Sequence, residues 1–101
     1  MKCKSFNLFF ETIANRTRMK IIQALFMKPL SVSEICKATG EEQSKVSHNL
    51  RILKACHIID SKTKGKSRIY SLNKETIVPL MQLVEKHVSN YCGCRCERAL
   101  R

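Results

Sequence analysis

The chain has 101 residues, with 19 Lys and Arg against 8 Asp and Glu, and a formal net charge of +11 at pH 7. This length predicts a single domain, and the positive charge favours a polyanionic partner. The few, scattered carboxylates offer no arrangement of nucleophile, base and oxyanion donors, so we expect no enzyme. No apolar run reaches the length of a membrane span and no secretory signal is recognisable, so we expect a cytoplasmic protein without a membrane partner.

Apolar residues at helical spacing predict two helices before residue 28, both in a core or an interface. The first run, within residues 4–14, contains Phe6, Phe9, Phe10 and Ile13, and the second contains Met19, Ile22, Leu25 and Phe26. Pro29 ends the second helix because its ring cannot continue a helix.

Residues 31–72 predict a short helix, a turn, a second helix and a basic hairpin. Ser31 is a candidate N-cap, with Glu34 three residues later as its capping-box partner. This helix runs through Ala38 and ends at Gly40. The second helix is expected from about Glu42 to Cys56.

The second helix has one apolar and one polar face. Val46, Leu50 and Leu53 are spaced to point inward, which leaves a polar set on the opposite face. That set comprises Ser44, Ser47, His48 and Arg51. Short hydrogen-bonding side chains of this kind suit the major groove of DNA, where base edges offer donors, acceptors and a methyl group.

The basic charge is concentrated around this helix and the hairpin after it. Residues 43–74 contain eight Lys or Arg and one acidic residue, Asp60. Apolar residues at 58–59 and 69–72 flank a turn at 62–66 around Gly65, which predicts two antiparallel strands. The position of the charge therefore favours a nucleic-acid partner over a merely solvated surface.

A last helix is expected from about Lys74 to Asn90, and its apolar stripe consists of Ile77, Leu80, Met81, Val84 and Val88. Pro79 requires either that the helix starts near it or that the helix is kinked there. The expected organisation is a domain over residues 1–91 and a Cys-rich tail over 92–101.

The segments ETIANRTRMKIIQAL, LSVSEICKATGEEQSKVSHNLRIL and GKSRIYSLN resemble the ArsR/SmtB family of metalloregulatory repressors over roughly residues 6–90. The most specific part is residues 43–50 followed by Leu53, with Asn49 where the family often has a second His. The resemblance implies a mainly α winged helix-turn-helix fold with a small antiparallel hairpin. It also implies a homodimer through the first and last helices, bound to an inverted-repeat operator in double-stranded DNA and released by an inducer, often a metal or metalloid ion.

Carried onto this sequence, the resemblance predicts a DNA-binding set of nine residues. These are Gln43, Ser44, Lys45, Ser47, His48, Arg51, Lys64, Lys66 and Arg68. The three wing residues are expected to contact phosphates, which take most of the hydrogen bonds in such interfaces. For His48, packing against the preceding helix or a phosphate is the alternative.

Six cysteines favour thiolate ligands or redox-active thiols over structural disulfides in a reducing compartment. Cys92, Cys94 and Cys96 alternate, so an extended backbone places their sulfurs on one face. Three thiolates suit As(III) or Sb(III), and a fourth ligand, for which Cys56 is the candidate, makes a Zn or Cd site. An inert tail is the alternative.

Other family metal positions are altered in this chain. Ser31 and Ser33 stand where metal-sensing members often carry Cys, and only His87 remains of the last-helix set. Cys36 is expected to be a small buried apolar residue, and His57 a turn residue.

The leading interpretation is a transcriptional repressor released from its operator by a thiophilic ion bound to cysteines. The alternatives are a redox-switched regulator, a constitutive DNA-binding regulator and a metal-sequestering protein, and the recognition helix argues against the last.

Overall fold

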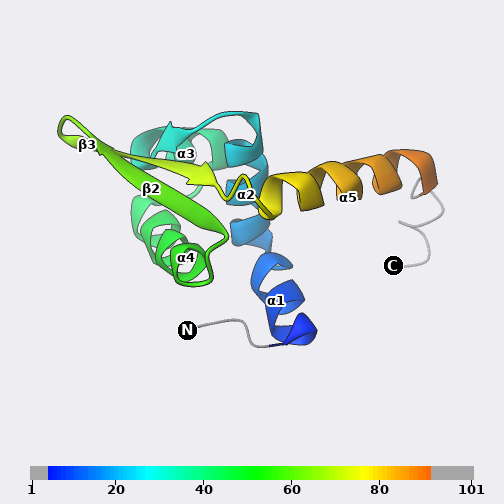
Figure 1. The fold of residues 1–101 in the computed structure, drawn as a ribbon. Coiled ribbons are helices and arrows are strands. Elements are labelled where there is room, and N and C mark those ends of the chain that lie inside the picture. The colour runs from blue at the N-terminus through cyan, green and yellow to red at the C-terminus, as the bar shows by residue number, and fades with distance from the viewer. Residues whose placement is uncertain (1–4, 92–101) are drawn as a thin grey trace.

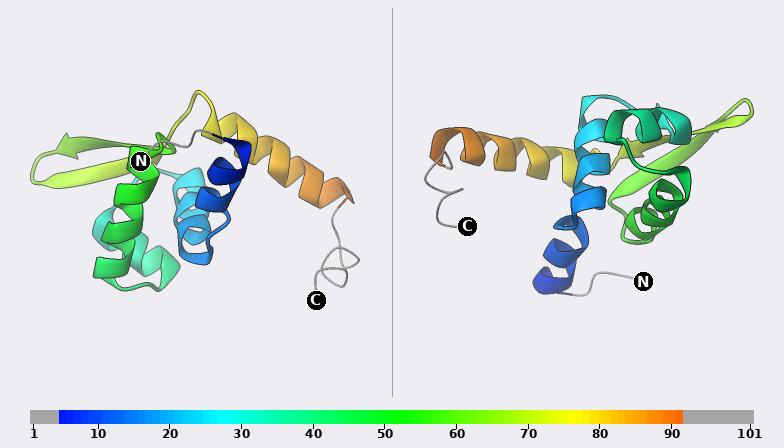
Figure 2. Two further views of the ribbon diagram at one scale, coloured as in Figure 1. Left: turned by 90° about the horizontal axis from the view of Figure 1, so that it is seen from below. Right: turned by 180° about the vertical axis from the view of Figure 1, so that it is seen from behind.

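The computed structural model describes residues 5–91. Within this range the elements follow in the order α1 (Phe6–Ile13), α2 (Arg16–Met27), β1 (Leu30–Ser31), α3 (Val32–Thr39), α4 (Gln43–Ala55), β2 (Ile59–Lys64), β3 (Ser67–Leu72) and α5 (Ile77–Tyr91). Helices α2, α3 and α4 pack together, and the β2–β3 hairpin projects from them (Figure 1). Helix α5 extends from this body in the opposite direction, as the further views confirm (Figure 2). The expected winged helix-turn-helix architecture is therefore confirmed.

Local capping fixes the ends of α3. The Glu34 backbone N–H donates to Ser31 Oγ at 3.4 Å, and the Ser31 N–H donates to Glu34 Oε1 at 2.9 Å, which completes the expected capping box. The latter bond is the main cause that lowers the pKa of the Glu34 carboxyl below its ordinary 4.5. At the other end, Gly40 adopts a left-handed φ of 73°, and its N–H donates to the Cys36 carbonyl. The tight turn into α4 follows from this glycine.

The sheet has the strand order β1-β3-β2, with both pairings antiparallel. Strand β1 was not predicted, because two residues after a proline carry no readable alternation. It pairs Leu30 with Tyr70 and extends the hairpin to three strands. The hairpin turn is the two residues Gly65 and Lys66, and Gly65 has a φ of 63°. Glycine at the first central position is typical of turns that match the twist of a hairpin.

One apolar core joins the three packed helices to the inner face of the sheet. Its fully buried side chains are Ile21, Ile22, Ile35, Val46, Leu50, Leu53, Ile58 and Ile59. Helices α1 and α5 contribute Ile13 and Ile77 to this core, but several of their other large apolar side chains are exposed. They are Phe6, Leu8 and Phe10 on α1, and Leu83, Val84, Val88 and Tyr91 on α5.

Helix α5 begins at Ile77, three residues later than expected, because Asn73 organises the segment before it. Asn73 Oδ1 accepts the backbone N–H groups of Glu75 and Thr76, at 2.9 and 3.3 Å. Pro79 therefore lies in the first turn, where a backbone N–H has no intrahelical acceptor. This agrees with the first of the two alternatives, a helix that starts near the proline.

In the described part of the chain, no helix is both long and apolar enough to cross a membrane.

Candidate nucleic-acid interface

Helix α4 presents the two faces that its sequence predicts. Val46, Leu50 and Leu53 are buried, with exposed fractions of 0, 2 and 0%. The predicted contact residues are on the other side, where Ser47 is half-buried and the rest of the set is exposed. The exposed members are Gln43, Ser44, Lys45, His48 and Arg51. A helix seated on its apolar face thus offers a continuous polar surface to solvent. His48 is exposed, which argues against its packing against the preceding helix.

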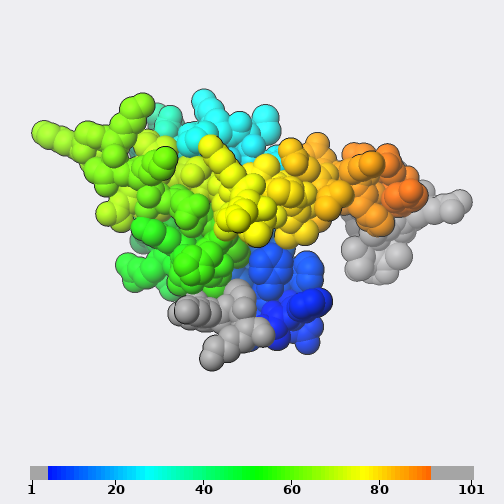
Figure 3. Space-filling view, in the orientation of Figure 1, coloured from blue at the N-terminus to red at the C-terminus, as the bar shows by residue number. Residues whose placement is uncertain are grey.

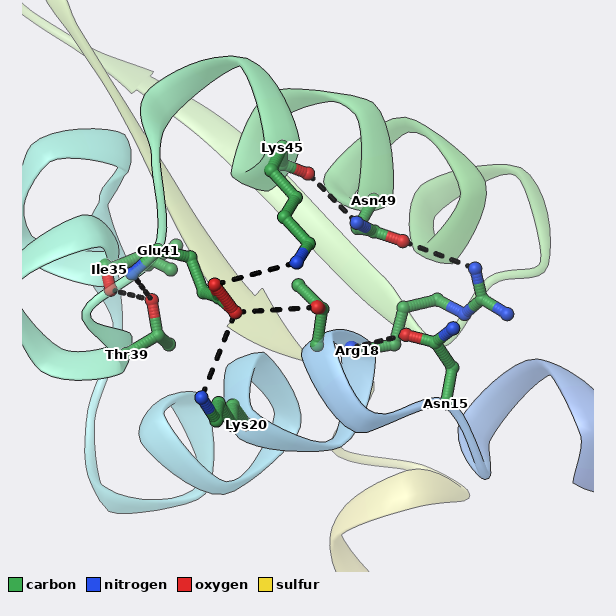
Figure 4. Close-up of polar contacts among 9 residues, drawn as sticks. Asn15, Arg18, Lys20, Ile35, Thr39, Glu41, Lys45 and Asn49 are labelled. Atoms are coloured by element: carbon green, nitrogen blue, oxygen red, sulfur yellow. Dashed lines mark hydrogen bonds and ion pairs between the residues drawn. The ribbon is translucent and has the colours of Figure 1, made fainter.

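The N-terminal end of α4 is tied to α2 through Glu41. The Thr17 hydroxyl donates to Glu41 Oε2 at 3.5 Å, and Lys20 Nζ lies 3.7 Å from the same oxygen (Figure 4). Lys45 Nζ lies 3.6 Å from Oε1. One carboxylate therefore joins two helices and also fixes the direction of Lys45, a predicted DNA-contact residue.

The middle of α4 is tied to α1 and α2 through Arg18, which lies on α2. Its Nη1 donates to Asn49 Oδ1 at 3.1 Å (Figure 4). Its Nε donates to the Thr12 carbonyl oxygen at 2.5 Å. Asn49 is 6% exposed, and its Nδ2 donates to the Lys45 carbonyl at 2.8 Å. Every polar atom of this buried amide side chain that needs a partner therefore has one.

The tip of the wing stands clear of the body and carries exposed basic side chains (Figure 3). Register places them on different faces, because side chains of directly paired residues share a face and alternate along each strand. Arg68 pairs with Thr63, on the same side as the buried Ile59–Leu72 pair. Lys64 pairs with Ser67 on the outer side, where it lines a groove with Lys62 and Lys74. Lys66 occupies the turn itself. The three predicted wing contacts therefore point in different directions.

The wing is held against α4 at its base. Lys54 Nζ donates to Ser61 Oγ at 2.7 Å, which joins the end of α4 to β2. His57, with a left-handed φ of 59°, makes the turn between them, and its carbonyl accepts Asn73 Nδ2 at 2.9 Å. His57 is therefore a turn residue, as expected. The helix and the wing are fixed in relation to each other by these contacts.

The cysteines divide into those in the described residues and those outside them. Cys36 and Cys56 are both half-buried against the core, Cys36 in the apolar role expected of it and Cys56 at the C-cap of α4. Cys92, Cys94 and Cys96 lie outside the described residues. Within residues 5–91, no cluster of three His, Cys, Asp or Glu is placed to hold a metal ion.

Sequence reasoning missed Arg18 and Glu41 as residues that position α4. The need of Asn49 for a hydrogen-bond partner could have been predicted, because the residue lies at the edge of the inward face of α4, where a polar side chain requires one. Its partner, 31 residues earlier, carries no mark in the sequence that distinguishes it from the neighbouring Arg16.

Comparison with known proteins supports this geometry. Residues 15–61 match the family model described as "Bacterial regulatory protein, arsR family". The transcriptional repressor SdpR of Bacillus subtilis is 33% identical over 67 residues, which cover 66% of this chain and 74% of SdpR. The chain belongs to the arsR family.

Other members of the arsR family extend the comparison. The regulator NmtR of Mycobacterium tuberculosis is 34% identical over 71 residues, and an SmtB repressor homolog of Synechocystis is 30% identical over 80 residues. These alignments cover 70 and 79% of this chain, but it spans only 59 and 61% of those two relatives. All three relatives are named as transcriptional regulators or repressors, in agreement with the expectation that the chain is not an enzyme.

A solved structure shares the fold of this arsR-family chain. It is the homodimeric winged helix-turn-helix DNA-binding domain Mb0332 of Mycobacterium bovis, which is 26% identical with a TM-score of 0.74. The match covers 80% of this chain and 75% of that one.

Proposed function

We propose that this chain is a sequence-specific, DNA-binding transcriptional repressor. The observation that carries the proposal is the exposed polar face of α4, together with the exposed basic side chains of the wing. Among residues 5–91, the ion pairs are those of Lys20 and Lys45 with Glu41, so the basic wing residues have no carboxylate partner there. Cations without internal partners attract the DNA phosphates, and the α4 face supplies donors and acceptors for base edges.

The roles within this surface follow from the type of side chain. Arg51, near the middle of the exposed face, is suited to a bidentate contact with guanine, and Gln43 to one with adenine. Ser44, Ser47 and His48 complete the base-facing set. The phosphate contacts are Lys45 on α4 and Lys64, Lys66 and Arg68 on the wing. Specificity is thus assigned to the base-facing residues of the helix, and general affinity to the wing and Lys45.

The protein binds DNA as a homodimer through α1 and α5. Support comes from the exposed apolar side chains on these two helices and from the homodimeric domain of similar fold. Phe6 is 84% and Leu83 is 66% exposed in the single chain, which is unfavourable in water unless a partner covers them. A two-fold dimer presents two α4 helices to two half-sites, so an inverted repeat is the expected operator. The protein is then cytoplasmic, and residues 1–91 form the DNA-binding and dimerisation domain.

Selection from a random pool of duplex DNA tests the DNA-binding proposal. Several rounds with the full chain should enrich one inverted repeat, with half-site centres separated by about one helical turn or a multiple of it. Arg51→Ala used as a parallel bait should enrich a less restricted sequence. Retention of DNA without enrichment of any sequence would contradict specific recognition.

We further propose that a thiophilic ion releases the protein from its operator. The supporting feature is the C-x-C-x-C tail of Cys92, Cys94 and Cys96, with Cys56 as a candidate fourth ligand. Three thiolates suit As(III) or Sb(III), and four ligands suit Cd or Zn. Such an ion must bind the DNA-free form more tightly, because equal affinity for both forms shifts no equilibrium.

Titration of the reduced operator complex with arsenite or cadmium tests this release. We expect release from the wild type and none from a variant with Ser at residues 92, 94 and 96. Cys36→Ser is the matched control and should respond as the wild type. Release only by an oxidant such as diamide would contradict ion sensing and indicate a thiol redox switch. Release by neither the ions nor the oxidant would indicate a constitutive regulator.

A further inference from the structure

Arg18 lies at the junction of three helices. It occupies the first turn of α2, where its backbone N–H donates to the N-cap side chain of Asn15 at 3.0 Å. Its half-buried guanidinium then reaches α4 through Asn49 (Figure 4). It also reaches α1 through the Thr12 carbonyl. The cap fixes the start of this side chain, and the two hydrogen bonds fix its end. A planar, multi-donor group is suited to such a bridge, which a lysine ammonium would not reproduce.

The contact with Asn49 adds a directional restraint to the buried side of α4. Asn49 is 6% exposed and also donates to the Lys45 carbonyl, so its amide has one satisfied orientation. The apolar side chains Val46, Leu50 and Leu53 fix the depth of the helix, but an apolar contact tolerates small rotations. A directional hydrogen bond to a charged donor does not, and loss of its partner leaves a buried polar group unsatisfied.

We propose that Arg18 is a positioning residue that sets the rotation of α4 relative to α1, and through it the sequence specificity of DNA binding. The inference rests on the proposed DNA-binding function. Hydrogen bonds to base edges require placement within about 0.5 Å, whereas attraction to phosphates tolerates larger displacements. A small rotation of α4 therefore weakens operator binding more than non-specific binding.

The chain supplies a matched control for the charge of Arg18. Arg16 is exposed in the same turn of α2. Arg18→Gln and Arg16→Gln each remove one positive charge, so both should lower affinity for a scrambled duplex equally. For a duplex selected with the wild type, Arg18→Gln should lose roughly tenfold more affinity than Arg16→Gln, the magnitude expected of one charged hydrogen bond.

Fluorescence anisotropy with the selected and scrambled duplexes gives the ratio of the two affinities. This affinity ratio is measured at a temperature where circular dichroism shows each variant to be folded. A merely structural role would lower the melting temperature and leave this ratio unchanged, which would overturn the inference. If Arg18→Gln does not fold, Arg18→Lys replaces it, because it keeps the charge and should still reduce the ratio.

A double-mutant cycle with Asn49→Leu identifies the contact itself. If Arg18 acts through Asn49, the double variant should lose about as much specificity as either single variant. Additive losses would contradict the proposed route. A wild-type protein that binds both duplexes equally would refute the DNA-binding proposal, which is a different result from an unchanged ratio in Arg18→Gln.

Discussion

At the scale of single residues, the surface divides into side chains that face bases and side chains that face phosphates. Arg51→Ala should lower the affinity for the selected operator by roughly 1–3 kcal/mol and relax discrimination at one base pair. Lys66→Ala should weaken binding to every sequence and reduce the slope of log affinity against log salt by about one ion.

Titrations of both variants at several salt concentrations measure these effects. Equal losses of Arg51→Ala on operator and random DNA would contradict the division.

The backbone of His57 has an unfavourable conformation in the turn between α4 and the wing. His57 is exposed and adopts a left-handed φ of 59°, which costs a residue with a side chain about 1–2 kcal/mol. His57→Gly removes this cost but increases the entropy of the unfolded chain, so the free energy of unfolding should rise by up to about 1 kcal/mol. His57→Val should lower it. Urea unfolding measures both, and a destabilised His57→Gly would mean that the imidazole makes a stabilising contact.

The residues of the interface were more predictable than the residues that hold it in place. The polar face of α4 follows from helical periodicity, because inward and outward residues differ in type. The contacts of Arg18 with Thr12 and Asn49 depend on how three helices cross, which no local pattern encodes. The tail cysteines remain predictions, since they lie outside the described residues.

At the scale of elements, the ends of α3 were predictable because caps and glycines are local signals. The capping box of Ser31 and Glu34 and the end of the helix at Gly40 were both expected. Strand β1 was missed because it depends on a tertiary partner, β3. The start of α5 near Pro79 was one of the two alternatives that the proline left open, and the side chain of Asn73 favours it through its bonds with the backbone of Glu75 and Thr76.

The capping box predicts a dependence of stability on pH. The pKa of Glu34 is lowered in the folded chain, chiefly by the backbone hydrogen bond from Ser31, so its ionised form favours folding. This contribution is fully present above the ordinary pKa of 4.5 and is lost as the pH falls through the lowered value. Glu34→Gln keeps an acceptor but removes the charge.

Melting temperatures of wild type and Glu34→Gln should therefore differ at pH 7 and converge as the pH falls towards 3. Glu75→Gln is a suitable control, since it removes an exposed carboxylate outside the capping box. A difference that is constant over the whole range would show that the charge of Glu34 has no part in the cap.

At the scale of the whole molecule, the wing and α5 extend in opposite directions from the helical body (Figure 2). This arrangement separates the proposed DNA contacts of the wing from the exposed apolar residues of α5. In the proposed dimer, the wing binds DNA and α5 contacts the partner chain. Val84 and Val88 are one turn apart on α5, and both are exposed, at 43 and 48%. Replacement of both by Glu should raise the dimer dissociation constant at least roughly thirtyfold.

Sedimentation equilibrium measures this change. Met27→Glu is the control, because it introduces the same side chain at an apolar residue of α2, outside the two helices assigned to the interface, and should leave association unaffected. A dimer that persists in the α5 variant would contradict an interface formed by this helix.

The most direct test of sequence-specific binding is a paired titration of the full chain with the selected operator and a scrambled duplex at one physiological salt concentration. The operator should bind at least about 10³-fold more tightly, because base contacts from α4 add to the phosphate contacts that both duplexes share. Equal affinity for the two duplexes would show that the basic surface binds DNA by charge alone, and would contradict sequence-specific recognition.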